Sequence, residues 1–503
     1  MNTNRRKFLQ KILYSSGLVY GLSSLTFAST NSDSASTSSG DTSIDYKALV
    51  NVFLSGGNDG VNTIIPLGVN YAKYQRTRLL LAIDEKFILP LITKTSNSGG
   101  IAGMHPALGG FALKRGDSDY GSIDVNSPKG GLYKLYLEDK VAVLSNVGTL
   151  IEPTSKTTIE KKTAKLPNFL RAHNRQSRQW MTANYIDPIY AKGWGGRMME
   201  KLNIKETLHH DFIATMMSVN GYNDWQRGEK SVAFGINPKG GSLYNKGKIG
   251  LEDARLEAFD AMLKSAVDDK SNPFIKHYGT LQSEMISQSN HLVSTVLKDL
   301  PLLNSEALFL EDFEKYDLSV ELTSIPKPEI DISLKLLAIV KLIQARIEGR
   351  LNASHQTFFV DMGGFDTHGD QLLGHHTLLL HLSNAIYAFQ RCMEEMGVSD
   401  KVTLFTGSDF GRSVTSNGRG SDHGWGGHHF VVGGAVKGGD IYGELPNVEF
   451  GSKDTHKEKY LIPTTATDQY GATLCRWFGA TSHLDELFPN LHNFSKQDLG
   501  FMA

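Results

Sequence analysis

Three runs of apolar, β-branched and aromatic residues stand out along the chain, and each is followed directly by glycines and a carboxylate. The runs cover residues 49–54, 357–360 and 402–406. Such short apolar runs, ended by glycine, predict buried β-strands. In an open α/β sheet the carboxyl ends of parallel strands share one edge, where ligands usually bind. The polar side chains that follow these runs are therefore expected to meet at that edge.

The pattern between these strands is mainly helical. Residues 132–148 form a helix-then-strand pattern, 166–180 and 251–300 have helical periodicity, and 331–350 predict an amphipathic helix that returns the chain to the core. A further strand is predicted at 430–434. Alternation of this kind predicts an α/β fold with a mostly parallel sheet. We expect one large domain over 47–503, with a helical insertion at about 195–330.

The amino terminus predicts export. Arg5 and Arg6, followed by Phe8 and Leu9, resemble a twin-arginine signal, and a modest apolar segment extends to Ala28. We therefore expect a signal peptide at 1–28, a flexible Ser/Thr-rich linker at 29–46, and a protein of the periplasm or cell surface. The apolar segment is too short and too weakly apolar to predict a membrane span, so the membrane is involved only through export.

Composition and charge narrow the function. The 503 residues are 40% hydrophobic and 21% charged, with a formal net charge of -1. This balance argues against a nucleic-acid protein with a broad basic surface. The two cysteines, Cys392 and Cys475, lie in predicted helices at a spacing that suits neither a metal knuckle nor a redox pair, so buried apolar roles are expected, with a disulfide left open.

The strand ends offer a set of candidate metal ligands. Carboxylates and imidazoles occur together there, a mixture that suits zinc, manganese or iron better than calcium. Each motif alone is also compatible with a turn or a helix cap, but their joint occurrence after three strands favours a metal or anion site. The candidate ligands are Asp59, Asp366, His368, Asp409 and His423.

Several motifs in combination resemble a known bacterial family. They are the Gly-Gly-Asn-Asp-Gly run at 56–60, the Met-His-Pro-Ala-Leu run at 104–108, Gly-Phe-Asp-Thr-His at 364–368, Ser-Asp-Phe-Gly-Arg at 408–412 and Asp-His-Gly-Trp-Gly-Gly-His at 422–428. With the twin arginines, they resemble the family called domain of unknown function 1501, which is placed near the alkaline phosphatase and sulfatase superfamily. The resemblance implies a three-layer sandwich, a mixed and mostly parallel sheet flanked by helices, and a site for one or two divalent ions, zinc first.

The same resemblance assigns roles to single residues. Asp59 would match the carboxylate after the first strand, Asp366 and His368 a carboxylate and histidine pair, Asp409 the later strand-end carboxylate, and His423 the last histidine ligand. Phe410 departs from the pattern, because phosphatases usually have a second histidine there. The implied substitutes are His428, His429, His375 and His105.

The nucleophile is less clear from the sequence. The corresponding stretch has Ala172 where the family often has serine. Either His173 and Asn174 position the substrate, or a hydroxyl such as Thr63 attacks, or a metal-activated water does. An equal alternative is that His173 and Asn174 only begin a helix.

These features predict an exported metal-dependent hydrolase of phosphate or sulfate esters. Arg412 would bind the ester oxygens, because a guanidinium matches their geometry, or would pair with Asp409. A small anionic ester or a glycan is the expected substrate class, and no protein partner is indicated.

Two other functions compete with this prediction. An inactive, metal-stabilised binding or assembly protein of the same fold is the main alternative, favoured by Ala172 and Phe410. A dinucleotide oxidoreductase is disfavoured because the glycine-rich run at 56–60 lacks the G-x-G-x-x-G spacing.

Overall fold

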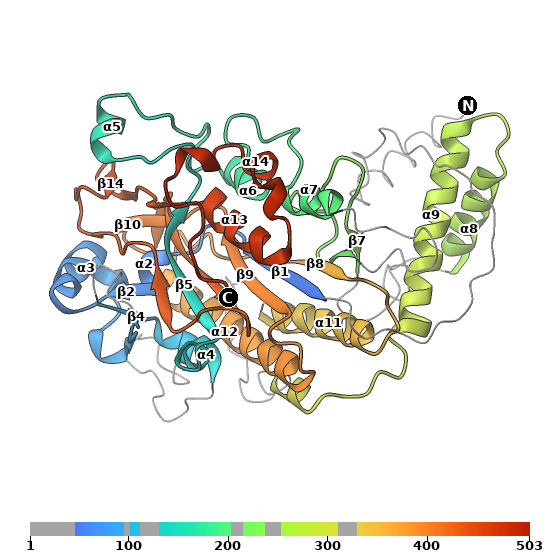
Figure 1. Cartoon of the computed structure of the whole chain (residues 1–503), viewed down its shortest axis with the longest axis horizontal. Helices are drawn as coiled ribbons and strands as arrows, with labels where there is room; N and C mark the ends of the chain where they lie inside the picture. The colour runs from blue at the N-terminus through green and yellow to red at the C-terminus, as the bar shows by residue number, and fades with distance from the viewer. Residues whose placement is uncertain (1–45, 95–100, 111–129, 203–214, 237–252, 310–328) are drawn as a thin grey trace.

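A nine-stranded mixed β-sheet runs through the middle of the molecule (Figure 1). The computed structural model describes residues 46–94, 101–110, 130–202, 215–236, 253–309 and 329–503. The predicted signal peptide and nearly all of the predicted linker lie outside these residues. The strands, in spatial order, are β13 (Asp440–Tyr442), β5 (Val141–Gly148), β12 (Gly427–Val432), β9 (Val402–Ser408), β1 (Lys47–Leu54), β8 (His355–Met362), β6 (Met216–Ser218) and β7 (Phe234–Gly235), with β16 (Thr465–Ala466) beside β5.

The sheet is mostly parallel, as predicted. Strand β1 pairs in parallel with both β8 and β9, and only β12 runs antiparallel to its neighbours among the described pairs. Leu54 lies opposite Met362 on one side and Ser408 on the other. The three loops that follow these strands therefore begin at the same level of the same sheet edge.

Helices cover both faces of the sheet. Along β1, Val50 and Val52 point into one apolar core while Leu49 and Phe53 point into the other, which is the alternation expected of a strand buried on both sides. One face is covered by α4 (Gly131–Leu137), α11 (Glu329–Ile347) and α12 (Gln371–Glu395). The other is covered by α6 (His173–Thr182), α7 (Trp194–Lys201), α13 (Thr467–Phe478) and α14 (Leu484–Leu487). The fold is the α/β sandwich that the alternating pattern predicted.

Smaller elements surround the site edge. They are α2 (Gly60–Thr63), α3 (Tyr71–Arg78), α5 (Lys156–Glu160), the small sheet of β2 (Ile64–Pro66), β3 (Leu89–Pro90) and β4 (Ala102–Met104), the pair β10 (Arg412–Ser416) and β11 (Ser421–His423), and the hairpin of β14 (Thr455–His456) and β15 (Tyr460–Leu461).

The predicted insertion at about 195–330 is not purely helical. Helices α8 (Asp253–Val267) and α9 (Pro273–His291) pack against each other as expected, on the right of Figure 1. However, β6 pairs in parallel with β8 and extends the central sheet, and β7 follows it. These strands are too short for the period-2 pattern to be visible in the sequence.

Two other boundaries differ from the prediction. Helix α6 begins at His173, later than the predicted 166, because Phe169 and Arg171 have φ values of 57° and 70°, which a right-handed helix excludes. His428 and His429 belong to strand β12 and are buried, whereas the sequence placed them in a polar loop.

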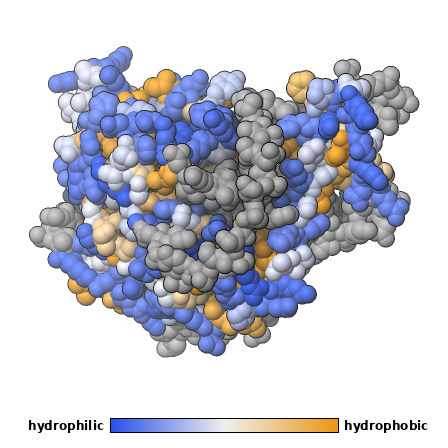
Figure 2. Space-filling view, turned by 45° about the vertical axis from the view of Figure 1, so that its right-hand side comes forward, coloured by the Kyte–Doolittle hydropathy of each residue, from blue (hydrophilic) through white to orange (hydrophobic). Residues whose placement is uncertain are grey.

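One face of the molecule is mostly polar. On the face shown in Figure 2, hydrophilic residues predominate and hydrophobic ones are scattered among them. No helix among the described residues is long and apolar enough to span a membrane. Cys392 and Cys475 are both buried and unpaired, in the apolar roles expected of them.

Candidate metal site

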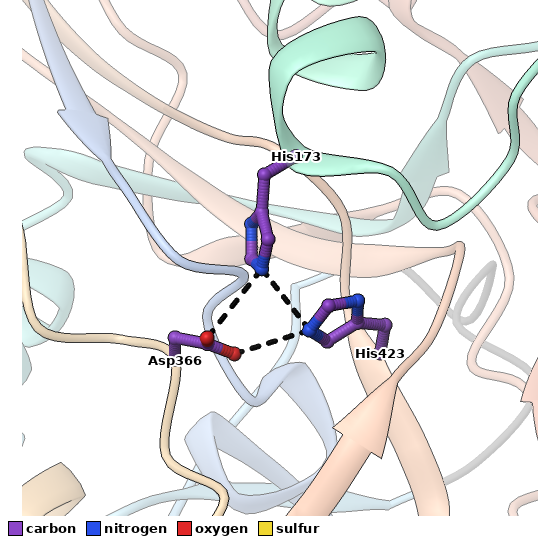
Figure 3. A group of neighbouring side chains, drawn as sticks. All are labelled: His173, Asp366 and His423. Carbon is purple, nitrogen blue, oxygen red and sulfur yellow. Dashed lines mark hydrogen bonds and ion pairs between the residues drawn. The ribbon is translucent and has the colours of Figure 1, made fainter.

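His173, Asp366 and His423 bring three potential ligand atoms to one point at the sheet edge (Figure 3). His173 Nε2 lies 3.0 Å from His423 Nε2 and 3.5 Å from Asp366 Oδ2. His423 Nε2 lies 3.2 Å from Asp366 Oδ1. The three residues come from α6, from the loop after β8 and from β11, so only the folded chain brings them together.

His173 is oriented by Asp409. Its Nδ1 lies 2.6 Å from Asp409 Oδ2, and the same oxygen accepts a hydrogen bond from the backbone N–H of Gly56 at 3.1 Å. Because Asp409 is buried and accepts the Nδ1 proton, the Nε2 atom of His173 is left with its lone pair facing the site. A carboxylate behind a histidine in this way is typical of metal-binding histidines.

His423 is oriented by a backbone carbonyl. Its Nδ1 donates to the carbonyl oxygen of Arg171 at 2.9 Å. This fixes the tautomer in which the Nε2 lone pair also faces the site. Two imidazole lone pairs 3.0 Å apart repel each other unless a proton or a cation lies between them.

The pKa values of the two histidines move in opposite directions. The hydrogen bond to Asp409 raises the pKa of His173, with the charge of Asp366 acting in the same direction. Burial, followed by the nearby His173, lowers the pKa of His423, although its bond to Arg171 opposes this. His173 therefore takes up a second ring proton more readily than His423 does.

Asp366 is held as a carboxylate by Arg412. Burial opposes its ionisation, but the hydrogen bond and charge of Arg412, with His368 and His173, place its pKa below the usual value. Arg412 Nη1 lies 2.6 Å from Asp366 Oδ1. The guanidinium is fully buried and also donates to the carbonyl oxygens of Gly56 and Ser421. Arg412 therefore pairs with Asp366 and not with Asp409, and its donors point to the protein.

His368 lies at the rim of this group. Its Nε2 is 3.1 Å from Asp366 Oδ1 and 3.0 Å from His423 Nε2, and its side chain is about half exposed. It is not among the three residues whose ligand atoms all lie within 4.8 Å of one another. His368 is thus placed to complete the coordination of an ion after a small movement.

The separations fit a single divalent ion. Ligand atoms about 2.0–2.1 Å from zinc in a tetrahedral site lie about 3.4 Å apart. The two Nε2 atoms lie 3.0 Å apart, and they lie 3.5 Å and 3.2 Å from different oxygens of the Asp366 carboxylate. Two neutral imidazoles and one carboxylate, with an open side toward solvent, also form the donor set typical of a catalytic zinc site.

Phe410 forms the apolar wall behind the two histidines. Its ring centroid lies 4.7 Å from that of His173 and 4.8 Å from that of His423. Gly57, with φ of 85°, approaches so closely that a Cβ atom there would lie 2.6 Å from Phe410 Cε2. The resemblance implied a histidine ligand at position 410. The structure has Phe410 there, and its ring packs against the two imidazole rings and fixes them.

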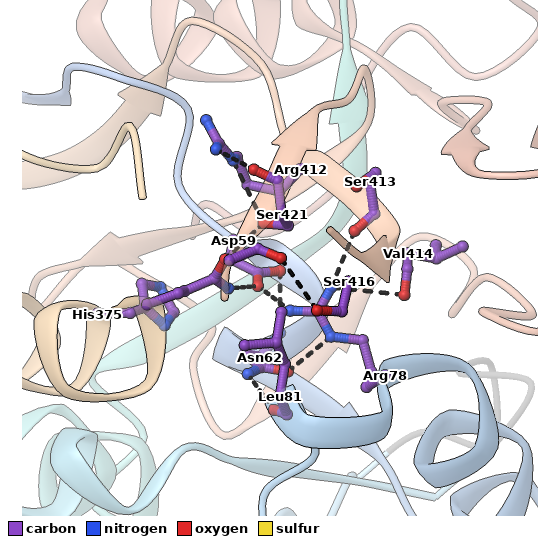
Figure 4. A network of polar contacts seen from close by, with 12 residues as sticks. Asp59, Asn62, Arg78, Leu81, His375, Arg412, Ser413, Val414, Ser416 and Ser421 are labelled. Carbon is purple, nitrogen blue, oxygen red and sulfur yellow. Dashed lines mark hydrogen bonds and ion pairs between the residues drawn. The ribbon is translucent and has the colours of Figure 1, made fainter. Parts of the chain in front are cut away.

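Asp59 lies outside this group, in a separate buried network (Figure 4). One carboxylate oxygen pairs with Arg78 and accepts from Gln371, and the other accepts from the backbone N–H of Asn62 at 3.3 Å, as the cap of α2. All the oxygens of Asp59 are therefore already satisfied by protein donors. The network reaches the site indirectly, because Ser421 Oγ donates to Gln371 at 2.6 Å and the Ser421 carbonyl accepts from Arg412.

The four histidines that were suggested as substitute ligands are all buried, and none belongs to the group of three candidate ligands. His375 Nε2 bonds to Asn58 at 2.9 Å, His428 Nδ1 accepts from the backbone N–H of Asn146, and His105 Nδ1 accepts from that of Ala107. Burial lowers the pKa of His375 and His428 to about 4 and that of His429 to about 3. They are neutral structural histidines.

The candidate nucleophile Thr63 and the positioning candidate Asn174 have different surroundings. Thr63 is fully buried and its hydroxyl donates to the carbonyl of Asp59 at 2.7 Å. Asn174 is exposed in the first turn of α6. His173, which the sequence suggested for substrate positioning, lies instead among the metal ligands.

Sequence reasoning missed the part played by Arg171. Its carbonyl orients His423 only because its backbone is left-handed, at φ of 70°. An arginine in a sequence does not indicate a left-handed backbone. Only Pro167, within the predicted helix 166–180, indicated a turn.

Comparison with protein families gives one clear match. Residues 347–479 match the family described as protein of unknown function, DUF1501. This segment is similar to the DUF1501 family. It contains Asp366, His368, Asp409 and His423, whereas His173 comes from outside it. The DUF1501 segment therefore supplies most of the site, and helix α6 completes it.

Solved structures give weak similarities. A mutant of the alkaline phosphatase PafA aligns with 74% of this chain and 64% of its own, at 9% identity and a TM-score of 0.29. Ps i-CgsB in complex with a neocarrahexaose aligns with 72% of this chain and 70% of its own, at 11% identity and a TM-score of 0.28. The chain thus spans less than two thirds of the phosphatase, and neither TM-score supports a functional comparison. No curated protein sequence matches the chain.

Proposed function

We propose that this protein binds one divalent metal ion through His173, Asp366 and His423 and acts on phosphate or sulfate esters after export. The observation that supports a metal is the convergence of two Nε2 lone pairs whose Nδ1 atoms are already bonded to Asp409 and to the Arg171 carbonyl. Zinc fits the donor set best, with manganese or iron as alternatives. Export through a twin-arginine signal is part of the proposal and rests on the sequence alone.

The residues of the chain divide the work of such a site. A divalent ion would polarise an ester oxygen and lower the pKa of a water molecule. Asp409 holds the imidazole of His173 in place, and Phe410 packs against both imidazole rings. Arg412 keeps Asp366 ionised and so keeps a negative ligand in the site.

A metal-activated water suits this site better than a side-chain nucleophile. Ala172 places no hydroxyl at the start of α6, and the hydroxyl of Thr63 is buried and bonded within α2. The same observation favours the second candidate function, a metal-stabilised binding or assembly protein of the periplasm or cell surface that has no turnover.

Metal analysis and activity together separate the two. The purified mature protein is analysed for zinc, manganese and iron, and is assayed with generic aryl phosphates and aryl sulfates before and after chelation. Turnover that is lost with the metal and restored by its return supports the hydrolase. Stoichiometric metal without turnover supports the binding protein, and metal content unchanged in His423→Ala and Asp366→Asn would refute both.

A further inference from the structure

The loop before α6, whose backbone contacts a candidate metal ligand, also carries an unpaired cation. Arg171 stands two residues before His173, and its carbonyl bonds to His423. Its guanidinium lies over the ring of Tyr460, with Cζ 4.2 Å from the ring centroid. Among the described residues, this guanidinium has no ion pair and no hydrogen bond. A guanidinium stacked in this way keeps its N–H edge available for an oxyanion.

Arginine is an unfavourable residue for the backbone conformation at position 171. Its φ of 70° lies in the left-handed region, which favours glycine over every residue with a Cβ atom. The backbone conformation is needed to aim the carbonyl at His423, but the side chain is not. A strained position that retains a long, charged side chain is an observation from which function can be inferred.

The neighbouring cation, Lys459, is paired with a carboxylate, whereas the guanidinium of Arg171 is not. Lys459 also approaches the Tyr460 ring, at 5.4 Å, but its Nζ pairs with Asp422 Oδ2 at 3.0 Å. The hairpin that presents Tyr460 is itself strained, with φ of 46° at Lys457 and 66° at Glu458. Two strained segments therefore meet at Arg171 and Tyr460, beside His423.

Two positively charged side chains act on the neighbouring His456. Burial lowers the pKa of His456 first, and the charges of Lys457 and Arg171 lower it further, while Glu160 acts weakly in the opposite direction.

We infer that Arg171, stacked on Tyr460, is a specificity-determining residue that binds a second oxyanion group of the substrate, such as a sulfate or phosphate substituent next to the reacting ester. The inference rests on the proposed function, because it assumes that the ester reacts at His173, Asp366 and His423. It predicts a preference for substrates with two or more anionic groups over those with one.

The test compares Arg171→Met with a matched control. Methionine keeps an unbranched side chain over Tyr460 and the left-handed backbone, but removes the charge. The control is Arg391→Met, because Arg391 is stacked in the same way on Tyr387, at 4.7 Å, but is paired with Glu138 and Glu394. Binding of inorganic sulfate and of a disulfated disaccharide is measured by calorimetry, with the metal-free and the zinc-loaded protein.

Arg171→Met is expected to weaken binding of the disulfated disaccharide at least tenfold, as loss of a charge-assisted hydrogen bond does. Arg171→Lys should recover part of it, and Arg391→Met should leave it unchanged. Arg171→Gly should lose the same affinity while raising the melting temperature, because glycine relieves the backbone strain. A merely structural arginine would instead lower the melting temperature of Arg171→Met and leave anion binding intact.

The two proposals fail in different ways. Zinc titration of the wild-type protein decides the metal site, and the comparison of anion affinity between the wild type and Arg171→Met decides the inference. Equal anion affinity in wild type and Arg171→Met, or no affinity in either metal state, would overturn the inference about Arg171 whatever the zinc titration shows.

Discussion

His173 Nε2 lies 3.0 Å from His423 Nε2 although the Nδ1 atom of each ring already donates a hydrogen bond, one to Asp409 and the other to the Arg171 carbonyl. Bringing two lone pairs face to face is unfavourable in itself. The fold does so by placing a helix start, a β-hairpin and the loop after β8 at one sheet edge, and a positive ion at the shared point would remove the repulsion.

The first prediction separates Asp366 from Asp59. Asp366→Asn should abolish stoichiometric zinc binding, since it removes the negative ligand, and should leave the sheet folded. Asp59→Asn should keep its zinc but lose about 3–5 kcal/mol of stability, because it breaks a buried pair and leaves the fully buried Arg78 uncompensated. Asparagine caps a helix as well as aspartate, so the loss is not one of capping.

Zinc content by mass spectrometry and unfolding in urea check these two variants. Loss of zinc in Asp59→Asn with its stability intact would place Asp59 in the site after all, contrary to Figure 4.

The second prediction concerns the residue behind His173. Asp409→Asn removes the negative charge that orients the imidazole, while the side chain keeps its size. Zinc affinity should fall about 10- to 100-fold, the usual effect of removing such a partner. Competition with a chromophoric chelator measures it. An affinity equal to that of the wild type would mean that the contact at 2.6 Å does not help His173 to bind metal.

The third prediction uses two glycines with similar backbones. Gly57 and Gly397 have φ of 85° and 68°, but a Cβ atom would lie 2.6 Å from the Phe410 ring at the first and would meet nothing within 4 Å at the second. Gly397→Ala should therefore lose only about 1–2 kcal/mol for its left-handed backbone. Gly57→Ala should lose roughly 1–3 kcal/mol more from overpacking, and should weaken zinc binding by displacing Phe410.

Urea unfolding and zinc titration of both variants test this. Equal losses of stability, with zinc affinity unaffected in both, would show that Phe410 does not position the histidines.

The fourth prediction is a pH dependence that arises far from the metal ligands. Burial raises the pKa of Asp468 from 3.8 to about 7, although the hydrogen bond from Tyr185 opposes the shift. The folded protein therefore binds this proton more tightly than the unfolded chain does. Its contribution to stability is complete below pH 3.8 and is lost as the pH rises to about 7, which amounts to on the order of 4 kcal/mol.

Asp468→Asn should flatten the stability profile across this window, because asparagine accepts the same bond from Tyr185 and does not titrate. Free energies of unfolding at the two ends of the window measure the effect. A wild-type profile with the same slope as that of the variant would refute the assignment.

Much of the sheet could be predicted from the sequence because its strands are buried on both faces. The apolar runs that lead into Asp366 and Asp409 are continuous, end at glycine and recur, so β1, β8 and β9 were all expected. The short strands β6 and β7 could not be expected, since they contain too few residues to show a period and are strands only because β8 offers them an edge.

The site was predicted in part. Asp366 and His423 are two of its three converging residues, His368 lies at its rim and Asp409 lies directly behind it. Asp59 follows its strand in the same way, yet Arg78, nineteen residues later, occupies its carboxylate. A sequence does not reveal which of several cations a carboxylate will meet.

What the amino-acid sequence by itself determined is the set of polar residues delivered to one sheet edge, because strand polarity and glycine-ended turns are local properties of the chain. What only the tertiary structure decided is which of them converge. The left-handed turn at Arg171, the start of α6 at His173 and the pairing of Arg412 with Asp366 depend on contacts between segments from 46 to 252 residues apart. Coordination is set by the directions of lone pairs in space, and those directions are fixed only when the distant segments have packed.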